Sequence, residues 1–523
     1  MGVVAVNAKV VQNIRKWGSI IWNAPGIRSA AMAVATGAIQ GPADNEKAFR
    51  VPSGERQLFL DDVGILKIDN LKRTMHQPTK KGAVIRPDLP WETTLQTRSV
   101  PAWDEKEKVF KLWMITSTNV PGAGGMTYAT SKDGVQWTKP VLGQWDFQGS
   151  RENNFMALEP TMQWPENAIE NVVYDPDDAD PARRYKGFLG AFDRRPMVSP
   201  DGVHWTLLDV PAIPSQDESN MSYDRQTRTF IATVKHGGPY GRSVHLSTSQ
   251  DFEHWTKPVL IFHADELDQE LGREHIKARQ ADHKLQMQRP LWDIRDTYKG
   301  RTAEPKVDVY NMGLFRYEGL YIGTPSMFHS NDNRWNKDGF HLIQLVCSRD
   351  LKTFKRLGNR QTFIGPSPVD QGAYDLTQLL GPSAPVIRGD ELWFYYTGIK
   401  YRTPPKDAEH DAKHDNGAIC LAVLRRDGFI SLDAGANNGI ILTKPFRLSG
   451  TKLFVNVDAP KGELRVEMLD GTGRAVARSE PLSGDLLREP VTWAEGNIAK
   501  MKVQNVSLRF TLRGGQFYSY WLE

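Results

Sequence analysis

Residues 131–137 read Ser-Lys-Asp-Gly-Val-Gln-Trp, and altered copies of this stretch recur along the chain. The serine, the aspartate and the final aromatic residue keep their spacing in most copies. Further copies lie at 199–205, 249–255 and 348–354, and a shorter one lies at 425–429. Internal repeats of this kind indicate an architecture built from copies of one unit. Because the aromatic residue recurs at equivalent places, we interpret it as packing between units, not as a platform for sugars.

The repeated turn accompanies short apolar runs that polar turns separate. In the first unit the runs lie at 98–103, 109–115, 126–130 and 137–142. Short β-branched and aromatic runs bounded by Gly, Pro or Asp are typical of strands. Four antiparallel strands in each unit make a propeller blade. The sequence therefore predicts an all-β protein in which residues 51–438 form a five-bladed β-propeller.

The repeat stops near residue 438. Later runs alternate apolar and polar residues as half-buried strands do, and they lie at 453–457, 463–469, 506–512 and 517–522. They predict a C-terminal β-sandwich over residues 439–523. Within the propeller, the insertion 264–306 begins with a charged stretch, 264–288, that has the apolar spacing of a helix. We expect this insertion to form a wall of a pocket or a surface for self-association.

Composition excludes several classes of partner. The chain of 523 residues has a formal net charge of only +4 and no basic run, so we expect neither nucleic acid nor a membrane surface as partner. No apolar run reaches the ~18 residues of a membrane-spanning helix. Cys347 and Cys420 read as buried apolar residues, and no Cys/His spacing suggests zinc. We expect no cofactor and no catalytic metal, with a structural calcium ion left open.

Residues 1–50 read as a leader or N-terminal extension. Basic residues precede an apolar patch, and an Ala-rich run follows at 29–38, in the order of a secretory signal. Arg28 interrupts that order. Secretion or a periplasmic location is therefore favoured over the cytoplasm only slightly.

The starts of the innermost propeller strands nominate the site residues, because these starts converge on one pocket. The carboxylate candidates are Glu92, Glu170, Glu218 and Asp308, and the substrate-binding candidates are Arg98, Asp217 and Tyr310. His236, which closes a strand of the third unit, is a further substrate-binding candidate. Two or three carboxylates facing one pocket are what glycosidic cleavage requires. Arg98, Arg194, Arg195 and Arg242 are candidates for a clamp on a carboxylated or sulfated sugar. A structural role is the alternative for each of these residues.

The chain resembles the furanosidase-type five-bladed propeller glycoside hydrolases, similar to families 32, 43 and 68, which include invertases, fructanases, arabinanases and xylosidases. The five units, the C-terminal β domain, Glu218 before 219–223, and the run Asp308-Val309-Tyr310 carry this resemblance. It implies Glu218 as the general acid and a pocket-lining place for Asp308 and Tyr310.

Two motifs of that family are replaced. Thr97-Arg98-Ser99-Val100 stands where invertases carry Asn-Asp-Pro-Asn-Gly, and Glu170-Asn171 stands in place of Arg-Asp-Pro. The base or nucleophile is thus unassigned among Asp308, Glu92 and Glu170. Glu92 is the first candidate because Trp91-Glu92 is similar to a Trp-Glu pair in propeller phosphorylases and hydrolases of mannosides. Asp61 and Asp62 are the fallback.

These features predict a glycoside hydrolase that acts on a poly- or oligosaccharide through carboxylates in the propeller channel. A non-catalytic carbohydrate-binding propeller is one alternative. A propeller glycoside phosphorylase is the other, and it would require Arg, Lys and His beside the acid together with a dependence on phosphate. Assembly into a homo-oligomer is left open.

Overall fold

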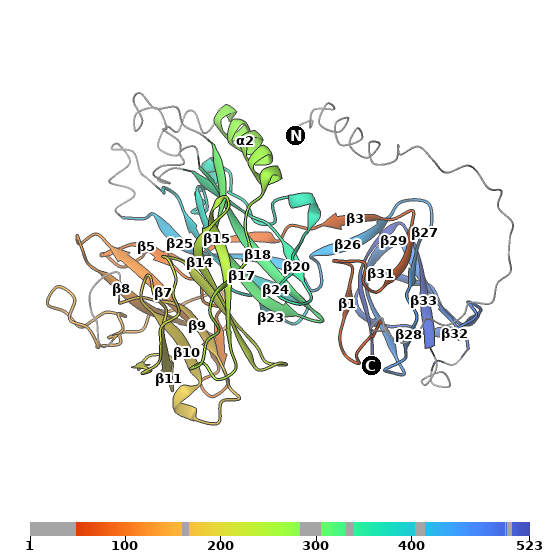
Figure 1. The fold of residues 1–523 in the computed structure, drawn as a ribbon, viewed down its shortest axis with the longest axis horizontal. Coiled ribbons are helices and arrows are strands. Elements are labelled where there is room, and N and C mark those ends of the chain that lie inside the picture. The colour runs from red at the N-terminus through yellow and green to blue at the C-terminus, as the bar shows by residue number, and fades with distance from the viewer. Residues whose placement is uncertain are drawn as a thin grey trace. The chain divides into compact units, whose positions relative to one another are not determined.

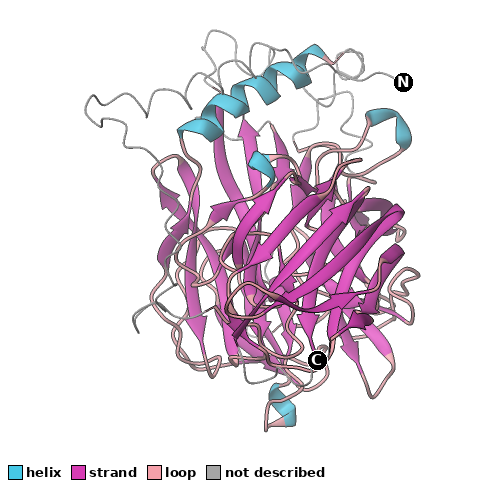
Figure 2. Ribbon diagram, turned by 90° about the vertical axis from the view of Figure 1, so that its right-hand side faces the viewer, coloured by secondary structure: helices cyan, strands magenta, loops and turns pink. Residues whose placement is uncertain are grey.

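Strands are the main secondary structure in the part of the chain that the structure describes. The computed structural model describes residues 49–158, 167–282, 305–330, 339–402, 414–496, 498 and 505–523. Strands dominate this part of the chain in Figure 2, so the prediction of an all-β fold is confirmed. The predicted leader lies outside the described residues except for residues 49 and 50. No helix in the described ranges is long and apolar enough to cross a membrane.

Three antiparallel sheets follow one another along the chain (Figure 1). In each, strands that are neighbours in the sequence pair through short polar turns. The first contains β9 (Ile169–Tyr174), β10 (Tyr185–Leu189), β11 (Arg195–Ser199) and β12 (Thr206–Leu207). The second contains β13 (Ser219–Asp224), β14 (Thr229–Gly238), β15 (Gly241–Ser249) and β16 (Val259–Phe262). The third contains β17 (Lys306–Tyr317), β18 (Leu320–Ser330), β19 (Phe340–Ile343), β20 (Val346–Ser348) and β21 (Lys355–Arg356).

A nine-stranded sheet holds two further groups. One group contains β22 (Gln378–Leu380), β23 (Val386–Arg388), β24 (Glu391–Ile399), β25 (Gly417–Arg425) and β4 (Thr79–Ile85). The other contains β5 (Glu92–Gln96), β6 (Ala102–Asp104), β7 (Val109–Thr118) and β8 (Gly124–Ser131). The groups meet at one parallel pair, Gly417 with Thr94. Because β4 precedes every repeat and yet pairs with β25, the N-terminal strand completes the last group.

The repeated turn has one hydrogen-bond pattern in its first four copies. The Ser131 hydroxyl accepts a hydrogen bond from the Gly134 N–H at 2.8 Å, and Asp133 Oδ1 accepts from the N–H groups of Val135 and Gln136 at 2.8 Å. The same bonds recur at residues 199–204, 249–254 and 348–353. The sequence motif is therefore a structural turn, in which the side chains satisfy backbone donors.

Each repeated turn contacts the group that precedes it. The ring of Trp137 lies 6.1 Å from Tyr395 of the last group, and the Trp113 indole donates to the Gly202 carbonyl at 2.6 Å. The remaining contacts are Trp255 with Phe188, Phe354 with Phe262 and Phe429 with Tyr317. Trp205 lies in one core cluster with Trp113 of the first group, so the prediction that Trp137, Trp205, Trp255 and Phe354 pack between units is confirmed. These contacts follow one cyclic order around the groups. Strand pairing places two of the groups in one sheet, so the count of five blades stays a prediction.

A second group of strands forms the C-terminal domain around the long strand β29 (Leu453–Leu469). Its later strands are β26 (Ile430–Ala434), β27 (Gly439–Thr443), β28 (Phe446–Arg447), β30 (Ala475–Ser479), β31 (Leu482–Pro490), β32 (Trp493–Glu495), β33 (Asn505–Arg513) and β34 (Gly515–Leu522). Residues such as Val455, Phe510 and Phe517 build its core. Strand pairing joins these strands into one sheet without dividing it into layers, so the β-sandwich stays a prediction.

The strands are divided between the domains differently from the predicted boundaries. Three N-terminal strands, β1 (Gln57–Leu58), β2 (Ile65–Asp69) and β3 (Lys72–Met75), belong to the C-terminal sheet. β1 pairs with β34, β2 with β27, and β3 with β26. Short alternating runs identify strands but do not say which sheet they join, and this is why the sequence placed 51–75 and β26 in the propeller.

The predicted helix is present as α2 (Glu266–Ala281), which lies across strand ends in Figure 2. Asp265 and Asp268 form a capping box at its N-terminus, and Ile276 packs with Phe340 and Leu342. Residues 283–288 of the prediction lie outside the described residues. The described 3₁₀ turns are η1 (Pro181–Arg183), η3 (Gly358–Arg360) and η4 (Val369–Gln371).

Candidate functional site

A cavity with several charged and polar side chains in its lining lies beside the first strands of the propeller groups, β5, β9, β13, β17 and β22. Its volume is about 360 Å³. It is lined by Gln96, Arg98, Ile115, Ala168, Glu170, Ala191, Phe192, Asp217, Glu218, Tyr310, Gln378 and Ile399. The structure thus brings together five of the predicted residues, namely Arg98, Glu170, Asp217, Glu218 and Tyr310.

Glu218 and Arg98 form a buried bidentate ion pair in this cavity. Arg98 Nε donates to Glu218 Oε2 at 2.7 Å, and Nη2 donates to Oε1 at 2.6 Å. Burial acts to lower the pKa of Arg98, but the charges of Glu218 and Glu170 outweigh it and the pKa lies above its usual value. Such paired bonds fix the geometry of both groups, so the Glu218 carboxylate is held rigidly.

Glu170 has a different environment. Its Oε2 accepts hydrogen bonds from the Ser219 N–H at 2.9 Å and the Ser219 hydroxyl at 3.0 Å, and it lies 3.1 Å from Arg194 Nη2. Burial raises the pKa of Glu170 to about 7, the charge of Glu218 adds to this, and Arg194 and Arg98 oppose it. A carboxyl group with this pKa is partly protonated at neutral pH, as a general acid must be.

A layer of amides and hydroxyls joins the innermost strands next to these carboxyl groups. Asn171 Nδ2 donates to Ser219 Oγ at 2.8 Å, and Asn311 Nδ2 donates to Asn220 Oδ1 at 2.9 Å. The Ser383 hydroxyl donates to the Arg98 carbonyl. Because these residues come from different groups, the layer fixes the distances between strands that carry the site.

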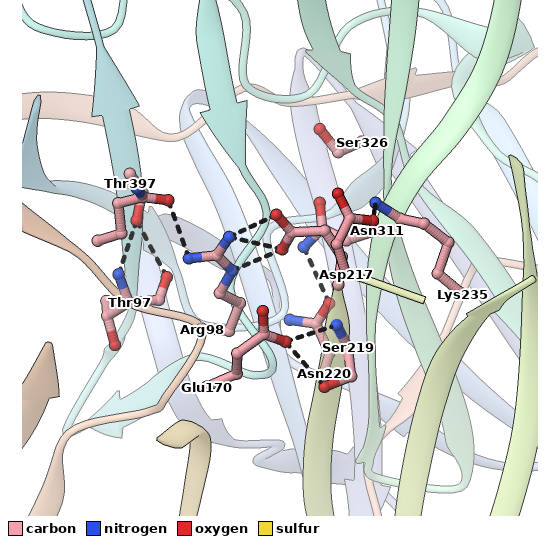
Figure 3. A network of polar contacts seen from close by, with 12 residues as sticks. Thr97, Arg98, Glu170, Asp217, Ser219, Asn220, Lys235, Asn311, Ser326 and Thr397 are labelled. Carbon is pink, nitrogen blue, oxygen red and sulfur yellow. Dashed lines mark hydrogen bonds and ion pairs between the residues drawn. The ribbon is translucent and has the colours of Figure 1, made fainter. Parts of the chain in front are cut away.

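Two further ion pairs involve predicted residues. Lys235 Nζ lies 2.8 Å from Asp217 Oδ1 (Figure 3). Arg242 donates through Nε and Nη2 to the two oxygens of Asp308, at 2.9 Å and 2.8 Å. Asp308 is buried in this pair and is not among the cavity-lining residues.

The remaining candidates lie elsewhere. Glu92 is buried with Lys139, whose Nζ lies 2.5 Å from its Oε2, and it does not line the cavity. His236 Nε2 donates to the Pro214 carbonyl at 2.9 Å, and Arg195 is half-buried in β11. Asp61 pairs with Arg349, and Asp62 pairs with Arg73. None of these five residues lines the cavity.

Sequence reasoning missed Lys235, Gln96 and Gln378. Gln96 and Gln378 line the cavity, and Lys235 is fully buried beside it in β14. For Lys235 the sequence carried a signal, because a lysine within an apolar strand is rarely buried without a partner. Gln96 and Gln378 carried no such signal, since glutamine at a strand end is common on protein surfaces.

The fold and cavity define a propeller protein with a polar, carboxylate-lined pocket. No family model matches the sequence, and no curated protein matches it. Among solved structures, similar ones include a *Bombyx mori* GH32 beta-fructofuranosidase, BmSUC1, at 11% identity and a TM-score of 0.38, covering 85% of this chain and 93% of that one.

Two other similar structures have comparable scores. A glycoside hydrolase family 43 arabinoxylan arabinofuranohydrolase from *Bacillus subtilis* is 10% identical with a TM-score of 0.36, covering 84% of this chain and 99% of that one. A structure from the GH130 family of mannoside phosphorylases, which contains glycoside hydrolases that target beta-1,2 mannosidic linkages in Candida mannan, is 13% identical with a TM-score of 0.38, covering 69% of this chain and 95% of that one. Families 32 and 43 are among those that the sequence resembles.

Within the described ranges, no group of three or more His, Cys, Asp or Glu side chains could hold a metal ion. Cys347 and Cys420 are both buried and unpaired with each other, as the sequence predicts. The structural calcium ion stays a prediction.

Proposed function

We propose that the protein cleaves glycosidic bonds of a poly- or oligosaccharide in this cavity, with Glu170 as proton donor and Glu218 as base or nucleophile. The observation that carries the proposal is the pair of buried carboxyl groups with unlike environments that line one cavity. Glycosidic cleavage uses one protonated and one ionised carboxyl group.

The two roles are reversed relative to those expected from the sequence resemblance. Arg98 holds both oxygens of Glu218 in short charge-assisted bonds. A carboxylate in a bidentate pair keeps further lone pairs that can accept a proton from water. Glu170 instead has a pKa raised to about 7, chiefly by burial. These differences support Glu170 as the acid.

The test is a screen of plant and algal glycans with product analysis, followed by Glu170→Gln and Glu218→Gln on the best substrate. Each change is expected to lower kcat by about 10²–10⁴-fold, the usual contribution of such groups. Glu92→Gln is the matched control, because Glu92 is a buried glutamate outside the cavity. Unchanged cleavage in Glu170→Gln would contradict the assignment.

The same assays separate the alternatives. Cleavage that needs inorganic phosphate and releases a sugar phosphate would identify a phosphorylase. Glycan binding without any cleavage, unaltered in Glu170→Gln, would identify a carbohydrate-binding propeller.

A further inference from the structure

Three cations surround the ring of Tyr310, which lines the cavity. Lys235 Nζ lies 3.8 Å from the centroid of this ring, and the guanidinium carbons of Arg242 and Arg402 lie at 4.9 Å and 5.0 Å. Arg242 and Arg402 also lie 4.7 Å and 4.5 Å from the ring of Phe328. We call Lys235, Arg242 and Arg402 the cation cluster. It places positive charge at the aromatic wall of the cavity.

Carboxylates hold two members of the cluster in place. Asp217 pairs with Lys235, and Asp308 pairs with Arg242. Burial lowers the pKa of Lys235 to about 8, although Glu218 and Asp217 act to raise it. Lys235 therefore keeps its charge at neutral pH in an unfavourable environment, and a further anion nearby would stabilise that charge.

His341 provides an independent sign of a missing acceptor. Its Nδ1 accepts a hydrogen bond from the Leu379 N–H at 3.1 Å, so the proton of the neutral ring is on Nε2. Nε2 is buried and has no hydrogen-bond partner within the described part of the chain. Burial and the charges of the cation cluster hold the pKa of His341 well below its usual value. Since buried donors are nearly always paired, this N–H in a positive field suits an anionic acceptor.

We propose that the cavity wall at Tyr310 binds a carboxylate or sulfate group carried by the sugar substrate. This inference rests on the proposed function, because it names the class of sugar that the cavity accepts. Tyr310 lines the cavity, and the ring of His341 lies 4.8 Å from its ring. Neither His341 nor the cation cluster is among the cavity-lining residues. In this proposal the substituent of a sugar unit packed against Tyr310 reaches past that ring to the cations, and His341 Nε2 donates to it.

Calorimetric titration of the intact protein tests this with D-glucuronate and D-galacturonate, each against its neutral counterpart, D-glucose or D-galactose. Inorganic sulfate and inorganic phosphate are titrated separately. The uronates are expected to bind at least about tenfold more tightly than the neutral sugars. Added salt is expected to weaken uronate binding, because it screens the charges. Arg402→Gln and His341→Phe are each expected to remove most of this preference.

Arg225→Gln is the matched control, because Arg225 forms an exposed ion pair with Asp177, and it should leave uronate binding unchanged. Thermal unfolding verifies that each variant is folded. Equal binding of glucuronate and glucose would overturn the proposal, as would full uronate binding in folded Arg402→Gln and His341→Phe. Binding of phosphate without uronate binding would also overturn it, and would assign the cluster to free phosphate.

Failure of this inference can be told apart from failure of the proposed function. If the protein binds uronates but cleaves no glycan, the anion site is supported and the proposed hydrolase activity is contradicted. If cleavage depends on Glu170 but the protein binds no uronate, the hydrolase activity is supported and the anion site is contradicted.

Discussion

Glu170 and Glu218 differ in the way their negative charges are compensated. Arg98 faces Glu218 with two parallel hydrogen bonds, whereas Glu170 meets Arg194 through one nitrogen and is otherwise held by Ser219. Both carboxyl groups are buried, so these partners decide how far each negative charge is compensated. The two carboxyl groups thus have different environments, and the proposed division of roles rests on this difference.

The proposed role of Glu170 as the acid predicts how cleavage depends on pH. Its pKa of about 7 means that it is protonated below this pH and ionised above it. A general acid must be protonated, so kcat/KM is expected to fall about tenfold per pH unit above that pKa. Rates measured from pH 5 to 9 test this. A rate that stays constant from pH 6 to 9 would contradict Glu170 as the acid.

Removal of Arg98 is expected to destabilise the protein strongly. Arg98→Gln leaves Glu218 buried without its partner, which costs about 3–5 kcal/mol in the free energy of unfolding. The double variant Arg98→Gln/Glu218→Gln should recover much of this loss, because it buries no unpaired charge. Denaturant unfolding measures both effects. Arg225→Gln removes one partner of an exposed ion pair and serves as the control, with an expected loss of about 0–1 kcal/mol in the free energy of unfolding. If the losses of Arg98→Gln and Glu218→Gln simply add in the double variant, the proposed coupling of the two side chains is contradicted.

At the scale of elements, the repeated turn uses one backbone conformation with different residues. The fourth residue has a positive φ in each of four copies: 76° at Gly134, 83° at Gly202, 67° at Phe252 and 60° at Leu351. Glycine adopts this conformation without strain, but Phe and Leu do not. Phe252 is fully buried and stacks on Phe188, so packing offsets its strain.

Gly134 also lies close to another strand. An added Cβ would stand 2.6 Å from the Tyr395 hydroxyl, whereas at Gly143, which also has a positive φ, it would meet nothing within 4 Å. Gly134→Ala is therefore expected to lower the free energy of unfolding by about 1–3 kcal/mol more than Gly143→Ala. Thermal unfolding of the two variants measures the difference. Equal losses would show that backbone strain alone matters.

At the scale of the molecule, Asp427 ties the propeller to the C-terminal sheet. This fully buried carboxylate accepts hydrogen bonds from Tyr317 at 2.6 Å, Ser519 at 2.6 Å and Asn456 at 3.1 Å, and it pairs with Arg56 at 2.5 Å. Its partners come from the propeller strand β17, the C-terminal strands β29 and β34, and the segment before β1. One side chain thus connects three distant parts of the chain.

Asp427→Ala is expected to cost about 3–5 kcal/mol, because it leaves Arg56 buried without its charge partner. Asp177→Ala removes the carboxylate of an exposed ion pair and is expected to cost about 0–1 kcal/mol. Calorimetric unfolding measures both changes. A loss for Asp427→Ala no larger than for Asp177→Ala would contradict its connecting role.

The sequence predicted part of the site and misplaced another part. Five residues were correctly predicted to line the cavity, because the innermost strands of a propeller converge on one pocket whatever motif they carry. They are Arg98, Glu170, Asp217, Glu218 and Tyr310. Glu92 met the same criterion, but the fold directs it to Lys139, a contact across 47 residues that no local pattern reveals. The proposed roles of Glu170 and Glu218 likewise depend on partners that are distant in the sequence.

The sequence by itself determined the all-β class, the repeated turn and the packing of its aromatic residue between units, because these follow from local alternation and spacing. Only the tertiary structure decided that β1–β3 join the C-terminal sheet, that β4 completes the last propeller group, and that burial raises the pKa of Glu170. Strand partners and pKa values depend on residues that are distant in the chain, and folding alone brings these together.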